Sequence, residues 1–158
     1  MEKLCRYTED KLCTLLSFLT QLPGQLEMIA DEIDNDNLRN ALCAVAEESS
    51  QYAMELNTQL KRLEIIPPVP AVIDLEAEII DRTLLVSVKE KGKEVLSICE
   101  RSEAFFSELY TGLLAGFFHN TTLKDMMQYQ LLGIKSAFMR IRLLNSIRFN
   151  NEMKHVTI

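Results

Sequence analysis

Apolar side chains recur along this chain at alternating steps of three and four residues, the spacing of a helix with one buried face. The first series predicts a helix that begins near Thr8, the expected N-cap, with acidic Glu9 and Asp10 in its first turn. Its apolar positions are Leu12, Leu15, Leu19, Leu22, Leu26, Ile29 and Ile33. The series keeps its phase across Pro23-Gly24, so this pair predicts a kink and not a helix end.

A second series follows the polar residues 34–37, which we expect to form a turn and to supply the next helix cap. Its positions are Leu38, Leu42, Val45, Ser49, Tyr52, Leu56 and Leu60 or Leu63. Because the turn is short, the two helices are predicted to be antiparallel neighbours.

The segment from Ile65 to Ile73 contains three of the four prolines and predicts an extended crossover. Asp74 is expected to cap a shorter helix that runs to about Glu90, and Gly92 is expected to mark a turn. A third long helix then follows. Its predicted inward positions are Val95, Cys99, Ser102, Phe106, Leu109 and Leu113.

The fourth helix is predicted after a loop at residues 116–121, where Thr122 and Asp125 have the spacing of a capping box. Its inward positions are Met127, Leu131, Ile134, Phe138, Ile141 and Leu144. The pattern stops at Asn150, which predicts one bundle domain over residues 1–149 and a flexible tail over 150–158. The predicted fold class is all-α, a ferritin-like four-helix bundle with a short extra helix in its one long crossover.

The composition fits one globular domain: the chain has 158 residues, of which 47% are hydrophobic and 25% charged. Its net charge of −6 argues against a nucleic-acid partner. Residues 1–66 hold 12 acidic and 6 basic side chains, whereas residues 114–158 hold 2 and 6. Either an acidic helix pair packs beside a basic last helix, or that last helix presents a basic face to an acidic partner such as a second copy.

The first ten residues lack the apolar core of a signal peptide, and no apolar stretch is long enough to span a bilayer. We therefore expect a cytoplasmic protein with no membrane partner. The four cysteines show no C-x-x-C spacing and are expected to be reduced. Three of them lie in apolar helical segments, and we expect these three to pack in the core: Cys13, Cys43 and Cys99.

Two stretches carry a resemblance to a known family. One runs from Ile98 through Glu103 to Tyr110, and the other from Leu131 to Arg142. They resemble a bacterial ferritin-like family of unknown function, whose third helix has an E-x-G-E-like core. Its fourth helix has a Gln-rich start and an Ile-Lys…His-Asp…Ile-Arg-like run. The resemblance implies a ferritin-like fold but no activity. Ser102 stands here in place of the glycine, and Phe138 and Met139 in place of the histidine-aspartate pair.

A dinuclear metal site in such a bundle needs inward glutamates and two Glu-x-x-His pairs. The chain has two histidines: His119 falls in a predicted loop, and His155 completes a Glu-x-x-His with Glu152 in the predicted tail. Phe138 occupies an inward position that a ligand would need. We therefore expect no complete di-metal site and no cofactor. The alternative is a carboxylate-rich metal-binding or oxidase-type enzyme, whose oxygen ligands would come from Glu27, Glu48, Glu100 and Glu103.

No catalytic constellation emerges from the remaining residues. Glu100 and Glu103 could form an acid/base pair, but helix-surface carboxylates are the simpler interpretation. Phe117 and Phe118, adjacent in a predicted loop, either contact a partner or cap the end of the bundle. The sequence thus favours a protein that is not an enzyme and acts through protein-protein contacts or as a structural homo-oligomer.

Overall fold

Four long helices make up the part of the protein that the structure describes. The computed structural model describes the backbone of residues 5–66, 91–116 and 120–156, and the side chains of these residues except 91–96 and 145–156. The helices are α1 (Arg6–Asp31), α2 (Asp36–Arg62), α5 (Lys91–Leu114) and α6 (Thr121–Val156). The predicted short helix from Asp74 to Glu90 lies outside the described residues, as does the predicted contact pair Phe117 and Phe118.

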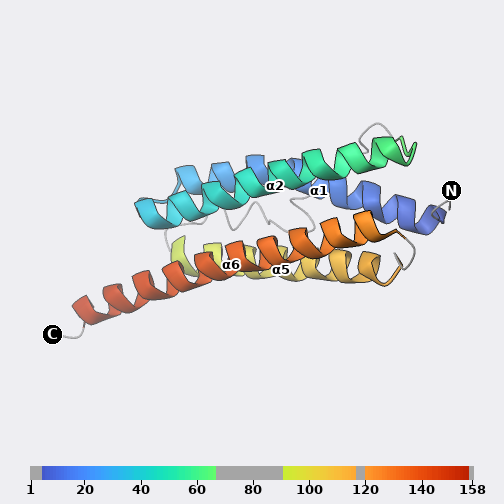
Figure 1. Cartoon of the computed structure of the whole chain (residues 1–158). Helices are drawn as coiled ribbons and strands as arrows, with labels where there is room; N and C mark the ends of the chain where they lie inside the picture. Colours follow the sequence, from blue (N-terminus) through green and yellow to red (C-terminus); the bar gives the residue numbers. More distant parts are fainter. Residues whose placement is uncertain (1–4, 67–90, 117–119, 157–158) are drawn as a thin grey trace.

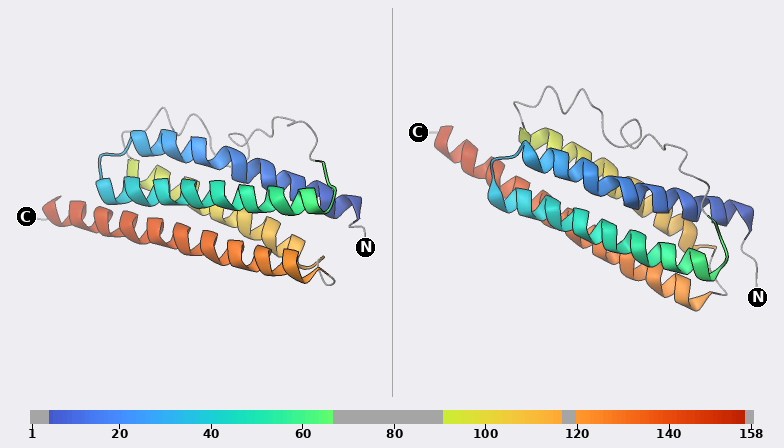
Figure 2. Two further views of the ribbon diagram at one scale, coloured as in Figure 1. Left: turned by 45° about the horizontal axis from the view of Figure 1, so that its top comes forward. Right: turned by 90° about the horizontal axis from the view of Figure 1, so that it is seen from above.

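The helices pack as a closed ring around one core. Helix α1 contacts α2, α2 contacts α6, α6 contacts α5, and α5 contacts α1 (Figures 1 and 2). Helices α1 and α6 run in one direction along the bundle and α2 and α5 in the other (Figure 1). The predicted antiparallel hairpins are therefore present. Helix α2 ends at one end of the bundle and α5 begins at the opposite end (Figure 1).

Most of the inward positions that the three-four spacing predicts are buried in the core, whereas Leu131 and Leu144 of α6 are half-buried and pack against it. All seven predicted positions of the first series are buried, and so are those of the second from Leu38 to Leu60. In α5 the spacing drifts: Leu109 is half-buried, because Tyr110 turns inward instead. Phe18 of α1 meets Phe105 edge-on with ring centroids 4.3 Å apart. This aromatic contact joins α1 to α5 across the bundle.

Helix α1 begins earlier than predicted, but it continues through Pro23 as predicted. The helix begins at Arg6 and not at Thr8, because the amide of Glu9 already donates a hydrogen bond to the carbonyl of Cys5 at 3.0 Å. The hydroxyl of Thr8 instead lies 3.1 Å from the sulfur of Cys5. Pro23 lies inside the helix, which continues to Asp31.

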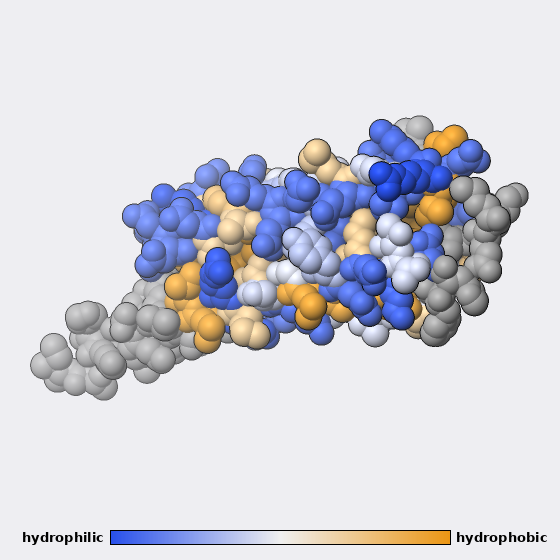
Figure 3. Space-filling view, in the orientation of Figure 1, coloured by the Kyte–Doolittle hydropathy of each residue, from blue (hydrophilic) through white to orange (hydrophobic). Residues whose placement is uncertain are grey.

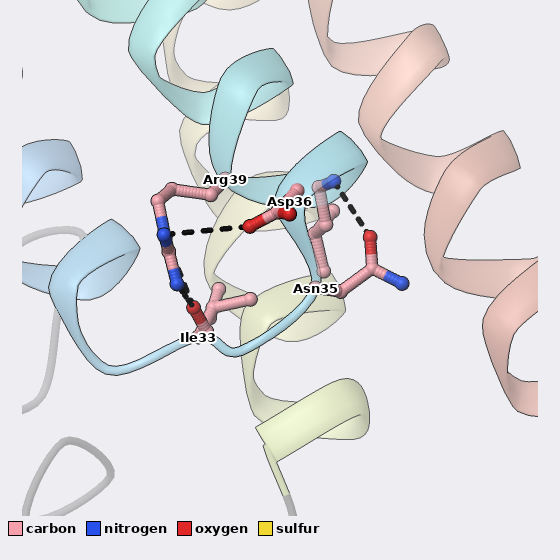
Figure 4. A network of polar contacts seen from close by, with 5 residues as sticks. Ile33, Asn35, Asp36 and Arg39 are labelled. Carbon is pink, nitrogen blue, oxygen red and sulfur yellow. Dashed lines mark hydrogen bonds and ion pairs between the residues drawn. The ribbon is translucent and has the colours of Figure 1, made fainter.

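The turn between α1 and α2 is held by side chains of its own polar residues (Figure 4). The side-chain oxygen of Asn35 accepts a hydrogen bond from the amide of Leu38 at 3.0 Å, which caps α2. Arg39 donates from Nε and Nη2 to the carbonyl oxygen of Ile33, and its guanidinium lies 3.5 Å from Asp36. These contacts satisfy backbone groups that the end of α1 and the start of α2 leave free. The predicted capping turn is confirmed, with Asn35 as the cap.

The structure corrects two predictions about where the helices of the α5–α6 pair begin. Gly92 does not mark a turn but lies within α5. The cap of α6 is Asn120, whose side-chain oxygen accepts from the amide of Leu123 at 3.0 Å. Thr122 therefore lies within the helix and is not its cap.

Helix α6 is the longest element and continues past the predicted end at Asn150 to Val156. It has 36 residues, whereas the other three helices have 24 to 27. No proline or glycine follows Gly133, so nothing in the sequence forces an earlier end. Its carboxyl-terminal part extends beyond the other helices in every view (Figures 1 and 2).

Candidate interaction surface

The middle of the bundle is filled by apolar side chains, at the level where ferritin-like bundles hold metal. Ile134 and Phe138 of α6 point inward and are 3% and 0% exposed. Phe106 of α5 and Leu19 of α1 are fully buried in the same core cluster. The expectation that Phe138 occupies an inward position is confirmed. A ligand or metal in this layer would have to displace close-packed side chains.

Among the side chains that the structure describes, three polar ones are buried in the core: Ser49, Ser102 and Gln130. The hydroxyl of Ser49 donates to the carbonyl oxygen of Leu19 at 2.7 Å, which links α2 to α1. The hydroxyl of Ser102 is fully buried and has no hydrogen-bond partner among the described residues. A hydroxyl without a partner is a cost to stability and not by itself a binding site.

Gln130 joins three helices through its side-chain amide. Its oxygen accepts from the hydroxyl of Tyr110 at 2.8 Å. Its nitrogen donates to the carbonyl oxygen of Tyr52 and to Glu55 Oε1, each at 3.3 Å. Burial, the largest cause, raises the pKa of the Tyr110 hydroxyl far above its usual range, so this group stays protonated and donates. The network is satisfied internally, which indicates a structural role.

The four glutamates proposed as oxygen ligands lie mainly on the surface. Glu27, Glu48 and Glu100 are exposed. Glu103 is half-buried, and both its oxygens face Arg142 of α6, at 3.2 and 3.3 Å from the two guanidinium nitrogens. Partial burial raises the pKa of Glu48, and Arg140 opposes this shift. Within the described part of the chain, no three His, Cys, Asp or Glu side chains lie where they could hold a metal ion together.

The four cysteines differ in how deeply they are buried. Cys99 is buried, and burial raises the pKa of its thiol to about 12, with Glu103 and Glu100 adding to the shift. Cys13 and Cys43 are half-buried and pack against the core, as the sequence predicts. Cys5 is exposed, and hydrogen bonding to Thr8 lowers the pKa of its thiol. The arrangement assigns Cys99 to packing, because a thiol that stays protonated is a poor nucleophile.

A shallow groove opens between α1 and α2 and has a volume of about 420 Å³. It is lined by Leu16, Thr20, Ser50, Ala53, Met54 and Asn57. A ligand pocket usually combines an enclosed apolar wall with a few convergent polar or charged groups. This groove is shallow, and none of the described residues that line it is charged, so it is a weak candidate for a small-molecule site.

The outer face of α6 is the most unusual feature of the surface. Tyr129, Leu132, Met139 and Leu143 are 63%, 69%, 51% and 58% exposed. They are half of the large apolar side chains that are exposed in the described part of the chain. With the exposed Ser136 they recur at steps of three and four residues, so they form one line along the helix, here called the α6 stripe.

The α6 stripe faces away from the bundle and has basic neighbours. The inward series of α6 includes Ile134, Phe138 and Ile141, and the stripe lies on the opposite side of the helix. Lys135 and Arg140 are exposed beside it. Figure 3 shows apolar side chains along the lower part of the visible face, over the course of α6, with polar side chains between them. Tyr129 also meets the ring of Tyr52 edge-on, with centroids 5.9 Å apart.

Sequence reasoning missed the α6 stripe as a surface. It predicted one apolar series in α6, beginning at Met127, and placed its candidate contact at Phe117 and Phe118. The signal was nevertheless present, because a second series at three-four spacing interleaves with the first. A helix with two apolar faces and one bundle to pack against must expose one of them.

Comparison with known proteins assigns the chain to no family: no family model, no curated protein and no solved structure matches it. The observed architecture is an all-α four-helix bundle, and the ferritin-like resemblance stays a hypothesis. Among the described helices, none is long and apolar enough to cross a membrane.

Proposed function

We propose that this protein acts through protein-protein contacts, as a cytoplasmic structural homo-oligomer, and that the α6 stripe is its contact surface. The observation that carries the proposal is the line of Tyr129, Leu132, Met139 and Leu143, each more than half exposed on one helix face. Contiguous apolar surface of this kind costs free energy in water and usually marks an interaction site.

The interior of the bundle supports the same interpretation. Gln130 is engaged with Tyr110, Tyr52 and Glu55, and Phe138 fills the middle layer. Neither arrangement leaves reactive groups facing a space where a substrate could lie. A contact function needs no such space, since it requires surface complementarity alone.

The ferritin-like path belongs to this proposal as well. Helices α2 and α5 run in the same direction, so α2 ends at one end of the bundle and α5 begins at the other (Figure 1). One long crossover between two antiparallel helix pairs is the ferritin-like arrangement. In a ferritin-like bundle whose middle is filled by Phe138 and Ile134, the four helices would still present an outer surface for protein-protein contacts.

The proposal is tested by removing the stripe without disturbing the core. Leu132→Ser with Leu143→Ser shortens two exposed side chains of the stripe. The matched control is Met28→Ser with Met54→Ser, which changes two exposed apolar side chains on α1 and α2. Sedimentation velocity over a range of concentrations reports association, and urea unfolding reports stability.

We expect the wild-type chain and the control pair to associate as concentration rises and the stripe pair to remain monomeric. All three should unfold at similar urea concentrations, because exposed side chains contribute little to the stability of the monomer. Loss of association in both pairs, or in neither, would contradict a contact surface on α6.

A further inference from the structure

The α6 stripe has large apolar residues at similar distances on both sides of its centre. Ser136 lies at its centre, with Tyr129 seven residues before it and Leu143 seven residues after. Leu132 and Met139 lie four residues before and three residues after the serine. In a two-fold interface residue i of one copy contacts residue j of the other and j contacts i, so one surface must be complementary to itself. An antiparallel copy of the stripe would set its large apolar side chains against one another on both sides of Ser136.

We propose that the partner of the α6 stripe is the α6 stripe of a second copy, packed antiparallel with the two-fold axis at Ser136. This inference rests on the proposed contact function and adds the partner and the geometry. In this register Tyr129 of one copy faces Leu143 of the other, and Leu132 faces Met139. Each large apolar side chain thus meets another, and small serines meet at the axis.

The length of α6 fits such a pair. Ser136 lies close to the middle of Thr121–Val156, so two antiparallel copies overlap from Thr121 to about residue 151. Thirty residues of helix extend over about 45 Å. The part of α6 that extends beyond its own bundle then lies along α6 of the second copy (Figures 1 and 2). One helix pair of this length gives an interface near the low end of specific complexes, so the dimer should dissociate on dilution.

The serine at the axis permits close contact. Packed helices have axes about 8–10 Å apart, and their Cα atoms lie about 2.3 Å from the axis. Two Ser136 Cα atoms that face each other would therefore be roughly 3.4–5.4 Å apart, which overlaps the range that a disulfide spans. A cysteine at position 136 would report this contact directly.

The charges beside the stripe give a way to distinguish a second α6 stripe from an acidic surface as the partner. Lys135 and Arg140 flank the stripe, and an antiparallel pair brings the two Lys135 side chains near each other. Salt screens the repulsion between like charges, so raising the ionic strength should strengthen the dimer. If the stripe instead bound an acidic surface, such as the exposed carboxylates of α1 and α2, salt would weaken association.

The test uses cysteine crosslinking in the full-length chain with Cys5→Ser, which removes the exposed native thiol. Ser136→Cys is compared with Ala104→Cys, at an exposed position of α5 away from the stripe. We expect Ser136→Cys to form a covalent dimer about 1,000-fold faster than the control, because contact in a dimer raises the effective thiol concentration from micromolar to millimolar. Peptide mapping should identify the 136–136 disulfide.

A second set of variants fixes the direction of pairing. Leu132→Cys mixed with Met139→Cys should form a mixed covalent dimer, whereas Leu132→Cys alone should not crosslink, because its two copies lie about 12 Å apart along the axis. Rapid crosslinking of Leu132→Cys with itself would mean parallel helices and would overturn the inference. So would association that weakens with salt.

The outcomes also separate this inference from the proposed function. If the Leu132→Ser, Leu143→Ser pair abolishes association but neither Ser136→Cys nor the Leu132→Cys and Met139→Cys mixture crosslinks faster than Ala104→Cys, the contact function stands and the antiparallel geometry is wrong. If the wild-type chain stays monomeric at every concentration, the homo-oligomer and the helix pair both fall.

Discussion

The hydroxyl of Tyr52 occupies the space where a side chain at position 133 would begin. A Cβ atom added to Gly133 would fall well inside van der Waals contact with Tyr52 Oη and would lie 3.0 Å from its Cζ. Tyr52 comes from α2 and Gly133 from α6, so the absence of a side chain at 133 sets how closely these two helices approach. The glycine costs helix stability in isolation, and this contact is the structural reason for it.

Gly133→Ala should therefore destabilise the protein, although alanine is the better helix former. We expect a loss of roughly 1–3 kcal/mol in the free energy of unfolding, the usual cost of overpacking a core contact. The matched control is Gly24→Ala in α1, where an added Cβ meets no atom within 4 Å. That change should stabilise the protein by about 0.5–1 kcal/mol.

The clash can be assigned to the hydroxyl by a second change. Combining Gly133→Ala with Tyr52→Phe removes the atom in closest contact, so the double variant should recover part of the lost stability. Urea unfolding of the four variants of this cycle measures the coupling. Strictly additive effects would show that the Tyr52 hydroxyl does not limit the approach of α2 and α6.

The two buried serines should respond oppositely to removal of their hydroxyls. Ser102 has no hydrogen-bond partner among the described residues, so Ser102→Ala should stabilise the protein by about 1 kcal/mol. Ser49 donates to Leu19, so Ser49→Ala leaves a carbonyl oxygen with one acceptor position unused and should cost about 1 kcal/mol. Equal losses of stability in both variants would mean that Ser102 makes a hydrogen bond in solution.

The cap of α6 can be identified by comparing two neighbouring residues. Asn120 accepts from the amide of Leu123, so Asn120→Ala should lower the free energy of unfolding by about 0.5–2 kcal/mol. Thr122 is exposed within the helix, and Thr122→Ala should change stability by less than about 0.5 kcal/mol. The reverse order in thermal or urea unfolding would restore the capping box that the sequence predicted.

Stability should fall in alkaline solution. Burial raises the pKa of the Cys99 thiol from 9.0 to about 12, and burial likewise raises the pKa of Tyr52 from 10.0 to about 12. Below about pH 9 the thiol is protonated in both the folded and the unfolded chain, and its contribution is fully present. As the pH rises from 9 toward 12, the unfolded chain loses protons that the folded chain keeps, and the folded state is disfavoured.

Urea unfolding at increasing pH should therefore show a declining free energy of unfolding above about pH 9. In Cys99→Ala the free energy of unfolding should decline less steeply with pH, whatever the stability of that variant at neutral pH. A thiol reagent should modify Cys5 in the native protein and Cys99 only after unfolding, because Cys5 is exposed with a lowered thiol pKa whereas Cys99 is buried. An unchanged slope in Cys99→Ala would contradict the assigned burial.

The sequence predicted the helices better than their ends or their outer surface. The three-four spacing identified the buried faces of α1 and α2, from Leu12 to Leu60, because each of these helices has one apolar side. Sequence patterns placed the helix caps wrongly at Thr8 and Thr122. Several polar residues near a helix start can act as the N-cap, and the local backbone geometry decides which of them does. Tyr110 and Gln130 were missed as core residues, because their burial depends on a hydrogen bond between two helices.

The candidate surface was the part that sequence patterns described least well. The predicted pair Phe117 and Phe118 lies outside the described residues, so that prediction stays untested. The α6 stripe was hidden because its apolar residues interleave with the inward series, and spacing alone does not tell which of two faces meets the bundle. The packing of Phe138 and Ile134 against the core decides it.

The central claim is that the outer face of α6 joins copies of this chain, and the mass of the wild-type protein in solution tests it most directly. Sedimentation equilibrium over a wide range of concentrations should show a mass that rises from 18.1 kDa toward twice that value. The transition should move to lower concentration as salt is added. A mass of 18.1 kDa at every concentration and salt level would contradict the claim.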